Sequence, residues 1–545
     1  MSAAVLHHLI IAPILLPLVM GAAMLLFEER QRTVKVVLTL ATLVALLVVG
    51  VLLLLGTNEV GPDGAGETLV YLLGNWPAPF GIVLVADRLS ALMLVLTAVL
   101  AASSFLFSLA RWHRAGPRFY SLFLFLLMGL NGAFLTGDLF NLFVFFEVML
   151  AASYGLVLHG SGTARVKAGL HYIPINLVAS SLFLVGVSLI YGVTGTLNMA
   201  DVARHVAGVA DGDRMLLEAG AAILAIAFLL KAGMWPLSFW LPTTYAAASA
   251  PVAAMFAIMT KVGVYVILRL FGLVFGAAAG PSADFGGEWL FYGGLATVTF
   301  GAIGVLASQS MNRLAGYSVL VSSGTLLAAI GTSDPRMISG ALYYLVSSTL
   351  AISAFFLLIE LIERGRVAGA DVLAVSMEVF GDMEDESDDV SEEVGVSLPL
   401  TLAALGGAFL CCTLLLAGLP PLSGFIGKLA MVAAVLGAED PISPSSWALI
   451  AVLMISSFAA LIAMTRTGIN TFWTTADMSI PSVKAVEFIP VLGLLAICFA
   501  LTIFAGPAMR FTDATAITLE APTTYVEDVL MAPRAGPASP SGAPR

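Results

Sequence analysis

Four charged residues lie inside long apolar stretches of the sequence, namely Glu147, Lys231, Lys261 and Lys428. The chain has six lysines, and three of them belong to this group. A charge at the centre of a membrane helix costs about 2.5–3.5 kcal/mol, so the four together cost on the order of 10 kcal/mol before pairing. Charges retained at that cost usually mark an ion or proton pathway. The alternative is structural, because a buried lysine can also pair to hold two helices together.

The chemistry that these residue types favour is proton transfer. Burial lowers the pKa of a lysine and raises that of a glutamate, whereas a neighbouring opposite charge reverses both shifts. A Lys–Glu pair that opens and closes can therefore take up and release a proton. We predict such a pair between Glu147 and Lys231, with Lys261 and Lys428 extending the relay. His171 and His159, near the ends of their predicted spans, could feed protons to it, or they are ordinary interfacial histidines.

The composition indicates that membrane-spanning helices position these charges. Apolar residues (AVILMFWYC) make up 59% of the 545 residues, charged residues only 11%, and the mean hydropathy is +1.00. Soluble domains carry about 25% charged residues. The composition therefore excludes an ordinary soluble enzyme, a disordered chain and a nucleic-acid-binding protein. The first apolar run lacks a cationic leader and a cleavage site, so we expect it to be a span and not a removed signal.

We expect an all-α polytopic membrane protein with about fourteen spans of roughly 20 residues each. Two of the spans are interrupted, and the stretch after Pro507, rich in Ala, Pro and Thr, is expected to be a tail outside the bilayer. The predicted spans are 4–27, 34–56, 89–110, 118–137, 138–160, 167–194, 215–240, 251–273, 288–308, 313–331, 336–363, 398–436, 446–466 and 486–506.

Lysines and arginines in the loops predict the orientation, since they concentrate on the cytoplasmic side. If the N-terminus is outside, the inner loops hold thirteen of them and the outer segments seven. We therefore expect both termini outside the cell membrane. The acidic run 377–393 then lies inside, either as a solvated loop or as a docking surface for a basic partner.

An internal repeat accompanies the two interrupted spans. The segment AGMWPLSFW (232–240) aligns with AGLPPLSGF (417–425), with five of nine residues identical. Proline removes an intrahelical hydrogen bond, and interrupted helices at matching places in two halves indicate a transporter binding region near the midplane. The alternative is a structural kink copied by duplication.

Other polar residues in the spans have simpler expected roles. Asp138 is expected to cap the helix that follows it. Asn131, Asn141 and Asn176 are expected to bridge helices. Four serines, at 322, 323, 347 and 348, are expected to allow close helix packing. The alternative is that they support a water chain. The cysteines, at 411, 412 and 498, are expected to be small core residues, and no sequence pattern indicates a metal or a cofactor.

Several segments resemble the D subunit of the Mrp-type multisubunit cation/proton antiporters. The most specific is GDLFNLFVFFEVMLAASY (137–154), and the similarity covers roughly residues 75–470. It extends to the antiporter-like subunits of respiratory complex I. The further matching segments are Gly195–Asp201, Lys231–Pro242, Ser249–Tyr265 and Pro420–Lys428.

The resemblance implies a fourteen-helix fold with two inverted five-helix repeats, in which helices seven and twelve are broken. Glu147 would be the glutamate of helix five, Lys231 its lysine partner on helix seven, Lys261 the central lysine of helix eight and Lys428 the terminal lysine of helix twelve. One departure is Ser347, which occupies the place of a histidine that family members commonly carry on helix eleven. A serine cannot titrate near neutral pH, so a water or another residue must act there.

The function that we expect is that of an ion-translocating subunit, not an enzyme, in a complex that exchanges Na⁺ or another monovalent cation for H⁺. Its partners would be sibling antiporter subunits. The alternatives are a proton-pumping subunit of a complex I-like or hydrogenase-linked redox complex, and a scaffold with vestigial charges. We expect four regions: N-terminal helices 1–3 (1–110), a first repeat (111–280), a second repeat (281–470), and helix 14 with the tail (471–545).

Overall fold

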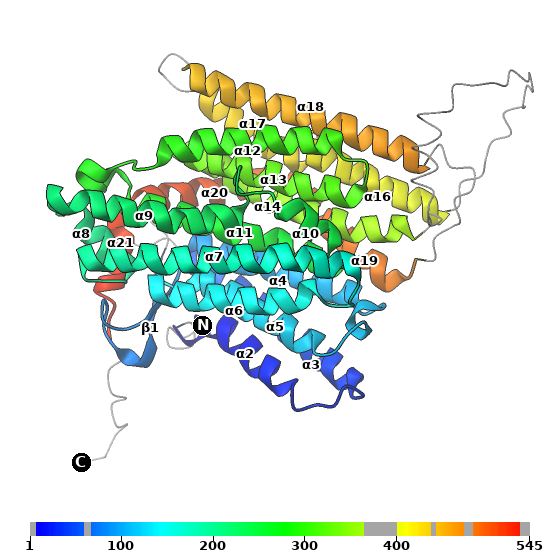
Figure 1. Cartoon of the computed structure of the whole chain (residues 1–545), viewed down its shortest axis with the longest axis horizontal. Coiled ribbons are helices and arrows are strands. Elements are labelled where there is room, and N and C mark those ends of the chain that lie inside the picture. Colours follow the sequence, from blue (N-terminus) through cyan, green and yellow to red (C-terminus); the bar gives the residue numbers. More distant parts are fainter. Residues whose placement is uncertain (1–6, 59–66, 365–399, 438–442, 473–482, 535–545) are drawn as a thin grey trace, which may run out of the picture.

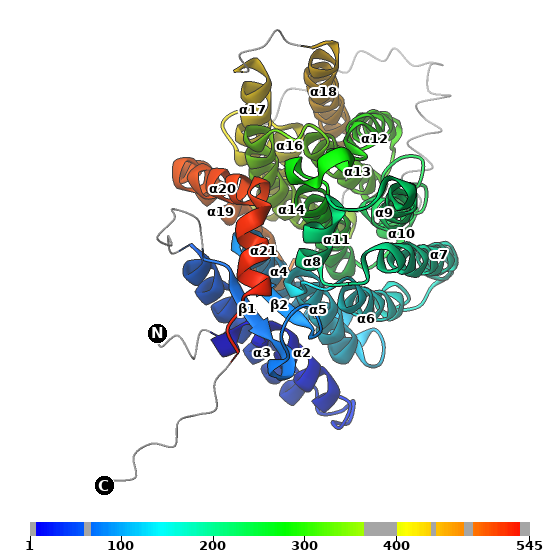
Figure 2. The ribbon, with the colours of Figure 1, turned by 90° about the vertical axis from the view of Figure 1, so that its left-hand side faces the viewer.

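The computed structural model describes residues 7–58, 67–364, 400–437, 443–472 and 483–534. Long helices run side by side along one direction, and an end-on view shows them packed as a bundle (Figures 1 and 2). The acidic run 377–393 lies outside the described residues.

The N-terminal half contains ten helices and two strands within the described residues. They are α2 (Ala12–Ala23), α3 (Arg32–Thr57), β1 (Leu69–Leu72), β2 (Val83–Ala86), α4 (Arg88–Ser108), α5 (Phe119–Leu135), α6 (Leu139–Val157), α7 (Thr163–Thr194), α8 (Met199–Val206), α9 (Asp211–Ala232), α10 (Leu241–Ala247) and α11 (Ala250–Val274).

The second half contains nine further helices in the part of the chain described. They are α12 (Gly287–Ala307), α13 (Met311–Ile330), α14 (Pro335–Glu363), α16 (Leu400–Ala417), α17 (Ser423–Leu436), α18 (Pro444–Phe472), α19 (Ala485–Ile503), α20 (Ala505–Glu520) and α21 (Pro522–Leu530). Short 3₁₀ turns occupy Leu73–Asn75, Trp112–Arg114 and Ala277–Ser282.

Every predicted span coincides with a helix. Among the described residues, twelve helices are long and apolar enough to cross a membrane, and α2, α5 and α17 are shorter apolar helices. The two interrupted spans divide into α9 with α10 and α16 with α17. The chain is therefore a predominantly helical, multi-pass membrane protein.

Burial separates the helices into a centre and a rim. The apolar window of α11 is buried along its whole length, and α13 and α14 are nearly so. In contrast, less than half of the apolar window is buried in α3, α7, α18 and α19. Since the bilayer is itself apolar, these exposed faces suit contact with lipid or with other membrane subunits.

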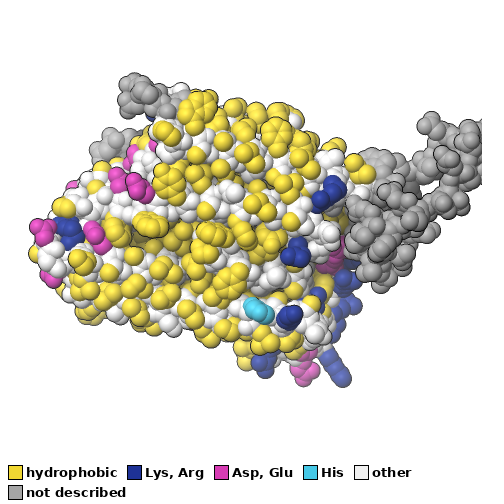
Figure 3. Space-filling view, turned by 45° about the horizontal axis from the view of Figure 1, so that its top comes forward, with side chains coloured by type: hydrophobic (Ala, Val, Ile, Leu, Met, Phe, Trp, Pro, Cys, Tyr) yellow, Lys and Arg dark blue, Asp and Glu magenta, His cyan; other side chains and the backbone are white. Residues whose placement is uncertain are grey.

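The space-filling view shows a broad apolar band between two polar ends (Figure 3). Lysines and arginines gather at one end, where α3, α7 and α13 begin, and acidic side chains mark the other, near α8 and the start of α9 (Figures 1 and 3). This separation of charge along the helix direction matches the loop pattern in the sequence.

Two regions differ from the sequence prediction. The stretch after Pro507 is not a loose tail, because α20 packs against α14 and α21 packs against α8, with Tyr525 and Val529 buried. In addition, β1 and β2 form an antiparallel hairpin, which pairs Leu69 with Ala86. Both elements are short or only moderately apolar, so a search for long apolar runs misses them.

An ion pair at the α8 and α21 end fixes three distant segments. Arg269 of α11 donates two hydrogen bonds to Asp87, which caps α4, over 2.5 and 2.8 Å. The ring of Tyr525 lies 5.4 Å from the Arg269 guanidinium. The bidentate geometry and the burial of both partners make this a strong, specific contact.

Candidate functional site

The two broken helices have the same local geometry. Gly233 and Gly418 both adopt positive φ angles, +77° and +68°, which a side chain would disfavour. In each copy the next amide donates to a carbonyl five residues earlier, Met234 to Leu229 and Leu419 to Leu414, both over 2.9 Å. The repeat found in the sequence is therefore a repeat of structure, and each break follows directly on a helix end.

Lys231 lies in the last turn of α9, next to the first break, and is fully buried. Its Nζ donates to the Tyr172 hydroxyl on α7 over 3.3 Å. That hydroxyl is also 2.8 Å from Ser153 Oγ on α6. The ammonium lies 5.5 Å from the Tyr172 ring and 5.9 Å from the Phe146 ring, so two aromatic faces add cation–π attraction.

Glu147, on α6, accepts a short hydrogen bond from Ser180 of α7. The ion pairs of the described residues do not include one between Glu147 and Lys231. The predicted pair is therefore in an open arrangement, with each member held by a hydroxyl group of α7. Such an arrangement keeps the two charges in one region without neutralising them directly.

Lys261, in the middle of α11, is fully buried, and its hydrogen-bond partners among the described residues are hydroxyl groups. Its Nζ donates to Ser322 Oγ over 2.8 Å and to Ser323 Oγ over 3.3 Å, both on α13. Ser322 in turn lies 2.9 Å from Ser348 Oγ on α14. Ser322 and Ser348 thus form a polar chain from Lys261 through α13 to α14. The expectation that these serines only allow close helix packing did not predict this chain.

Lys428 lies on α17, just past the second break, with 2% of its surface exposed. It donates to Ser457 Oγ of α18 over 2.7 Å and to the Ala417 carbonyl over 3.4 Å. The Tyr344 ring lies 6.0 Å from its Nζ. A Cβ at Gly418 would approach Lys428 Cδ to 2.8 Å, so the glycine of the break makes room for this side chain.

A small cavity lies next to residues that lead to the central and to the terminal lysine. It is lined by Ser318, Tyr344 and Ser348 together with apolar residues of α12, α13, α14, α16 and α18. Ser348 connects it to Ser322 and Lys261, and Tyr344 lies beneath Lys428. The cavity is therefore lined both by a serine of the chain that reaches Lys261 and by the ring next to Lys428.

The two secondary candidates lie in different environments. Ser347 faces the second broken helix, because its Oγ is 2.8 Å from that of Ser423. His171 is exposed, and its Nδ1 contacts the Lys167 carbonyl of its own helix, over 2.9 Å. His159 is buried and bonds to the Trp112 carbonyl over 2.8 Å, and burial lowers its pKa. The structure thus places Ser347 beside the second broken helix but His171 on the exposed face of α7.

The expectations for Asp138 and the asparagines can also be compared with the structure. Asp138 caps α6 by accepting from the Asn141 amide over 2.8 Å, as predicted. Asn131 bridges α5 to the Pro13 carbonyl of α2 over 2.9 Å. Asn141, on α6, donates to the hydroxyl of Thr136, which ends α5, over 2.9 Å, so it also joins two helices. The prediction is wrong for Asn176, which donates to the Tyr172 carbonyl of its own helix.

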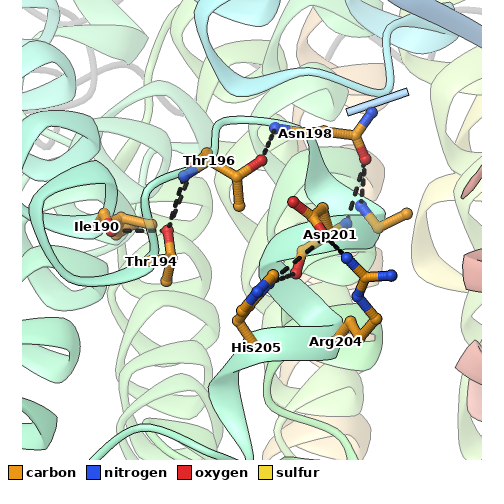
Figure 4. A network of polar contacts seen from close by, with 8 residues as sticks. Ile190, Thr194, Thr196, Asn198, Asp201, Arg204 and His205 are labelled. Carbon is orange, nitrogen blue, oxygen red and sulfur yellow. Dashed lines mark hydrogen bonds and ion pairs between the residues drawn. The ribbon is translucent and has the colours of Figure 1, made fainter. Parts of the chain in front are cut away.

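A second polar network stabilises α8 at the end of the bundle (Figure 4). Asn198 Oδ1 caps α8 by accepting from the amides of Ala200 and Asp201 over 3.1 and 3.2 Å. Buried Asp201 pairs with Arg204 over 2.5 Å and with His205 over 3.4 Å. The bonds drawn in this network lie within residues 190–205, so it holds the connection between α7 and α9 and does not join the lysine axis.

Sequence reasoning missed the hydroxyl groups that hold the charges, namely Tyr172, Ser180 and Ser457. Serine and tyrosine are ordinary residues in apolar spans, and their position on the helix face depends on how each helix is rotated. The spacing of Tyr172 and Ser180, eight residues apart on one helix, is the signal that could have found them, because it places both on one face.

Comparisons with known proteins show the family of this chain. Residues 136–463 match the family model described as NADH:quinone oxidoreductase/Mrp antiporter, transmembrane region. A probable K⁺/H⁺ antiporter D subunit of Rhizobium meliloti (strain 1021) is 60% identical over 97% of this chain and 99% of its own. The Na⁺/H⁺ antiporter D subunit of Alkalihalophilus pseudofirmus is 34% identical over 96% and 99%.

Solved structures extend the similarity to the fold. A chain of the Mrp complex from Dietzia sp. DQ12-45-1b matches with a TM-score of 0.80 and 25% identity, over 97% of this chain and 100% of that one. A chain of respiratory complex I from Thermus thermophilus matches with a TM-score of 0.72 and 23% identity, over 94% and 99%, which shows the shared fold alone. This chain therefore belongs to the NADH:quinone oxidoreductase/Mrp antiporter membrane family, and within it to the antiporter D subunits.

Proposed function

We propose that this chain is the D subunit of a multisubunit monovalent cation/proton antiporter in the bacterial cell membrane, and that it carries the protons. The observation that supports this most directly is the row of three buried lysines, each held by hydroxyl groups inside the bundle. Buried charges of this kind mark proton paths in membrane proteins. Sibling subunits are its partners, and no catalytic chemistry is assigned to it.

The relay would run from Glu147 through Lys231 and Lys261 to Lys428. The serine chain of α13 and α14 supports the step from Lys261, and the cavity at Tyr344 supports the step to Lys428. Ser347, beside Ser423 at the second break, would support water in place of a titrating histidine. Because His171 is exposed, it would at most feed protons to the relay from outside the bundle.

The two halves would be inverted repeats, 111–280 and 281–470, with the N-terminal helices (1–110) and the segment 471–545 at the sides. The matching breaks at Gly233 and Gly418 support this division. Both termini would lie on the outer side of the cell membrane, at the end that carries few lysines and arginines.

K⁺ is our proposal for the preferred cation, because the 60% identical relative carries that ion in its name, whereas the relatives named for Na⁺ are 34% and 32% identical. The whole complex, produced in cells lacking other antiporters, should dissipate a proton gradient in everted vesicles when KCl is added, and less when NaCl is added. A stronger response to NaCl would overturn the choice of K⁺, and a response to neither salt would overturn antiport.

The role of this subunit is tested with Glu147→Gln, which keeps the shape of the side chain but removes its charge. We expect assembly to survive and the cation-dependent dissipation to fall at least about tenfold. Glu288→Gln, an exposed glutamate at the start of α12, is the matched control and should keep the wild-type rate. Wild-type antiport by an assembled Glu147→Gln complex would contradict the proposed relay.

A further inference from the structure

One face of α7 is polar and buried, although most of this helix is exposed. Tyr172, Asn176 and Ser180 follow one another at four-residue intervals, which places them on the same side of the helix. Their exposed fractions are 0%, 0% and 7%. This face, which we call the α7 ladder, points into the bundle while its neighbours Leu177 and Val178 point outward.

The ladder ends at the two members of the open pair. At one end the Ser180 hydroxyl donates to Glu147, and at the other the Tyr172 hydroxyl accepts from Lys231 over 3.3 Å. Eight residues of helix separate these ends, a rise of about 12 Å. The ladder therefore spans the region between the carboxylate and the ammonium.

The middle of the ladder contains an unsatisfied acceptor. Asn176 Nδ2 donates to the Tyr172 carbonyl over 2.7 Å, but buried Asn176 Oδ1 accepts no hydrogen bond from the described residues. The buried Tyr154 hydroxyl also lacks a partner there, and its ring centroid is 5.5 Å from that of Tyr172. Buried polar atoms almost always have a partner, and ordered water is the usual one where protein supplies none.

We propose that the α7 ladder holds ordered water that carries the proton between Glu147 and Lys231, so that transfer needs no direct contact between the two side chains. This inference rests on the proposed function, since it assigns a path to the first step of the relay. Tyr172 and Ser180 are its terminal hydroxyls, and Asn176 is a positioning residue that holds the water with Oδ1.

The transfer balances along this path. Lys231 gives one proton to the Tyr172 oxygen while the Tyr172 hydroxyl proton passes to the first of several waters in a row, each of which accepts one proton and passes one on. The last water releases a proton to the Ser180 oxygen, and the Ser180 hydroxyl proton moves to Glu147. The lysine ends neutral and the glutamate protonated, and every hydroxyl and water ends as it began. Each oxygen accepts one proton and releases one.

The ladder is tested in the whole complex with Asn176→Leu and Tyr172→Phe. We expect normal assembly, a maximal antiport rate at least about tenfold lower, and an unchanged half-saturating cation concentration, because proton transfer and not cation binding is impaired. Two matched controls each lose one hydrogen bond to a backbone carbonyl elsewhere: in Asn131→Leu the bond that Asn131 donates to the Pro13 carbonyl, and in Tyr343→Phe the bond that Tyr343 donates to the Leu501 carbonyl. Both should keep the wild-type rate.

A second measurement does not depend on transport. High-resolution cryo-electron microscopy of the wild-type complex should show water density within hydrogen-bonding distance of Asn176 Oδ1. Absence of that density, or wild-type rates in both ladder variants, would overturn the proposal. If the wild-type complex itself performs no antiport, the proposed function fails, whereas the density still decides whether the ladder holds water.

Discussion

At the scale of single residues, hydroxyl groups hold Lys231, Lys261 and Lys428, and none of the ion pairs in the described part of the chain joins one of these lysines to a carboxylate. Ser322 and Ser323 contact Lys261, and Ser457 contacts Lys428. A carboxylate partner would favour the charged form of lysine. A hydroxyl oxygen accepts from an ammonium and its hydrogen can donate to a neutral amine, so the lysine keeps its position in both states. This arrangement suits a group that must change charge without moving far.

Lys428 provides the test of this interpretation. We expect both Lys428→Ala and Lys428→Arg to lower cation-dependent antiport at least about tenfold, because alanine removes the relay group and arginine hardly ever releases its proton. The measurement is the antiport rate of assembled complexes across a range of pH, with exposed Lys167→Arg as the control. Normal transport by Lys428→Arg at every pH would mean that a fixed positive charge suffices.

At the scale of elements, glycines set how closely the charged helices approach. A Cβ at Gly263 of α11 would lie 2.6 Å from the Phe228 carbonyl oxygen and 2.7 Å from the Ala232 amide nitrogen, both in the backbone of α9. Ala232 follows Lys231 directly. The contact of α11 with α9 therefore fixes the position of Lys231 relative to the helix that carries Lys261.

We expect Gly263→Ala to separate α9 from α11, at a cost of about 1–3 kcal/mol from overpacking, and to lower both thermal stability and antiport. Gly192→Ala on α7 is the matched control, because a Cβ there meets no atom within 4 Å and alanine favours the helix. Thermal denaturation of the purified complexes measures the difference. Equal stability of the two variants would contradict this account of the α9–α11 contact.

The helices themselves were predictable from the sequence, whereas their rotations were not. Apolar runs located the spans, and the Gly–Pro repeat located both breaks, because these signals are local. Whether Glu147 touches Lys231 or Ser180 depends on how α6, α7 and α9 are turned against one another, which depends on packing across the whole bundle. The packed helix α20 was missed for a related reason: its buried face is formed by threonines and alanine, namely Thr512, Thr515 and Ala516, and not by a long apolar run.

At the scale of the whole molecule, the separation of charge between the two ends predicts how the bundle sits in the membrane. We expect Gly212→Cys, at the start of α9, to react with a membrane-impermeant maleimide in intact cells, and Arg313→Cys, at the start of α13, to react only in everted vesicles. Both positions are exposed, and α9 and α13 begin at opposite ends of the bundle (Figure 1). Labelling of unsubstituted protein is the control for the three native cysteines. The reverse pattern would place both termini in the cytoplasm.

The contact of Tyr525 with the Asp87–Arg269 pair has a consequence for how the protein is made. Arg269 is synthesised 182 residues after Asp87, and Tyr525 is synthesised a further 256 residues later. While the intervening helices are inserted, the end of the bundle must stay open around an ion pair that its final partner has not yet covered. The contacts around this ion pair can therefore be completed only after the second half of the chain has been translated.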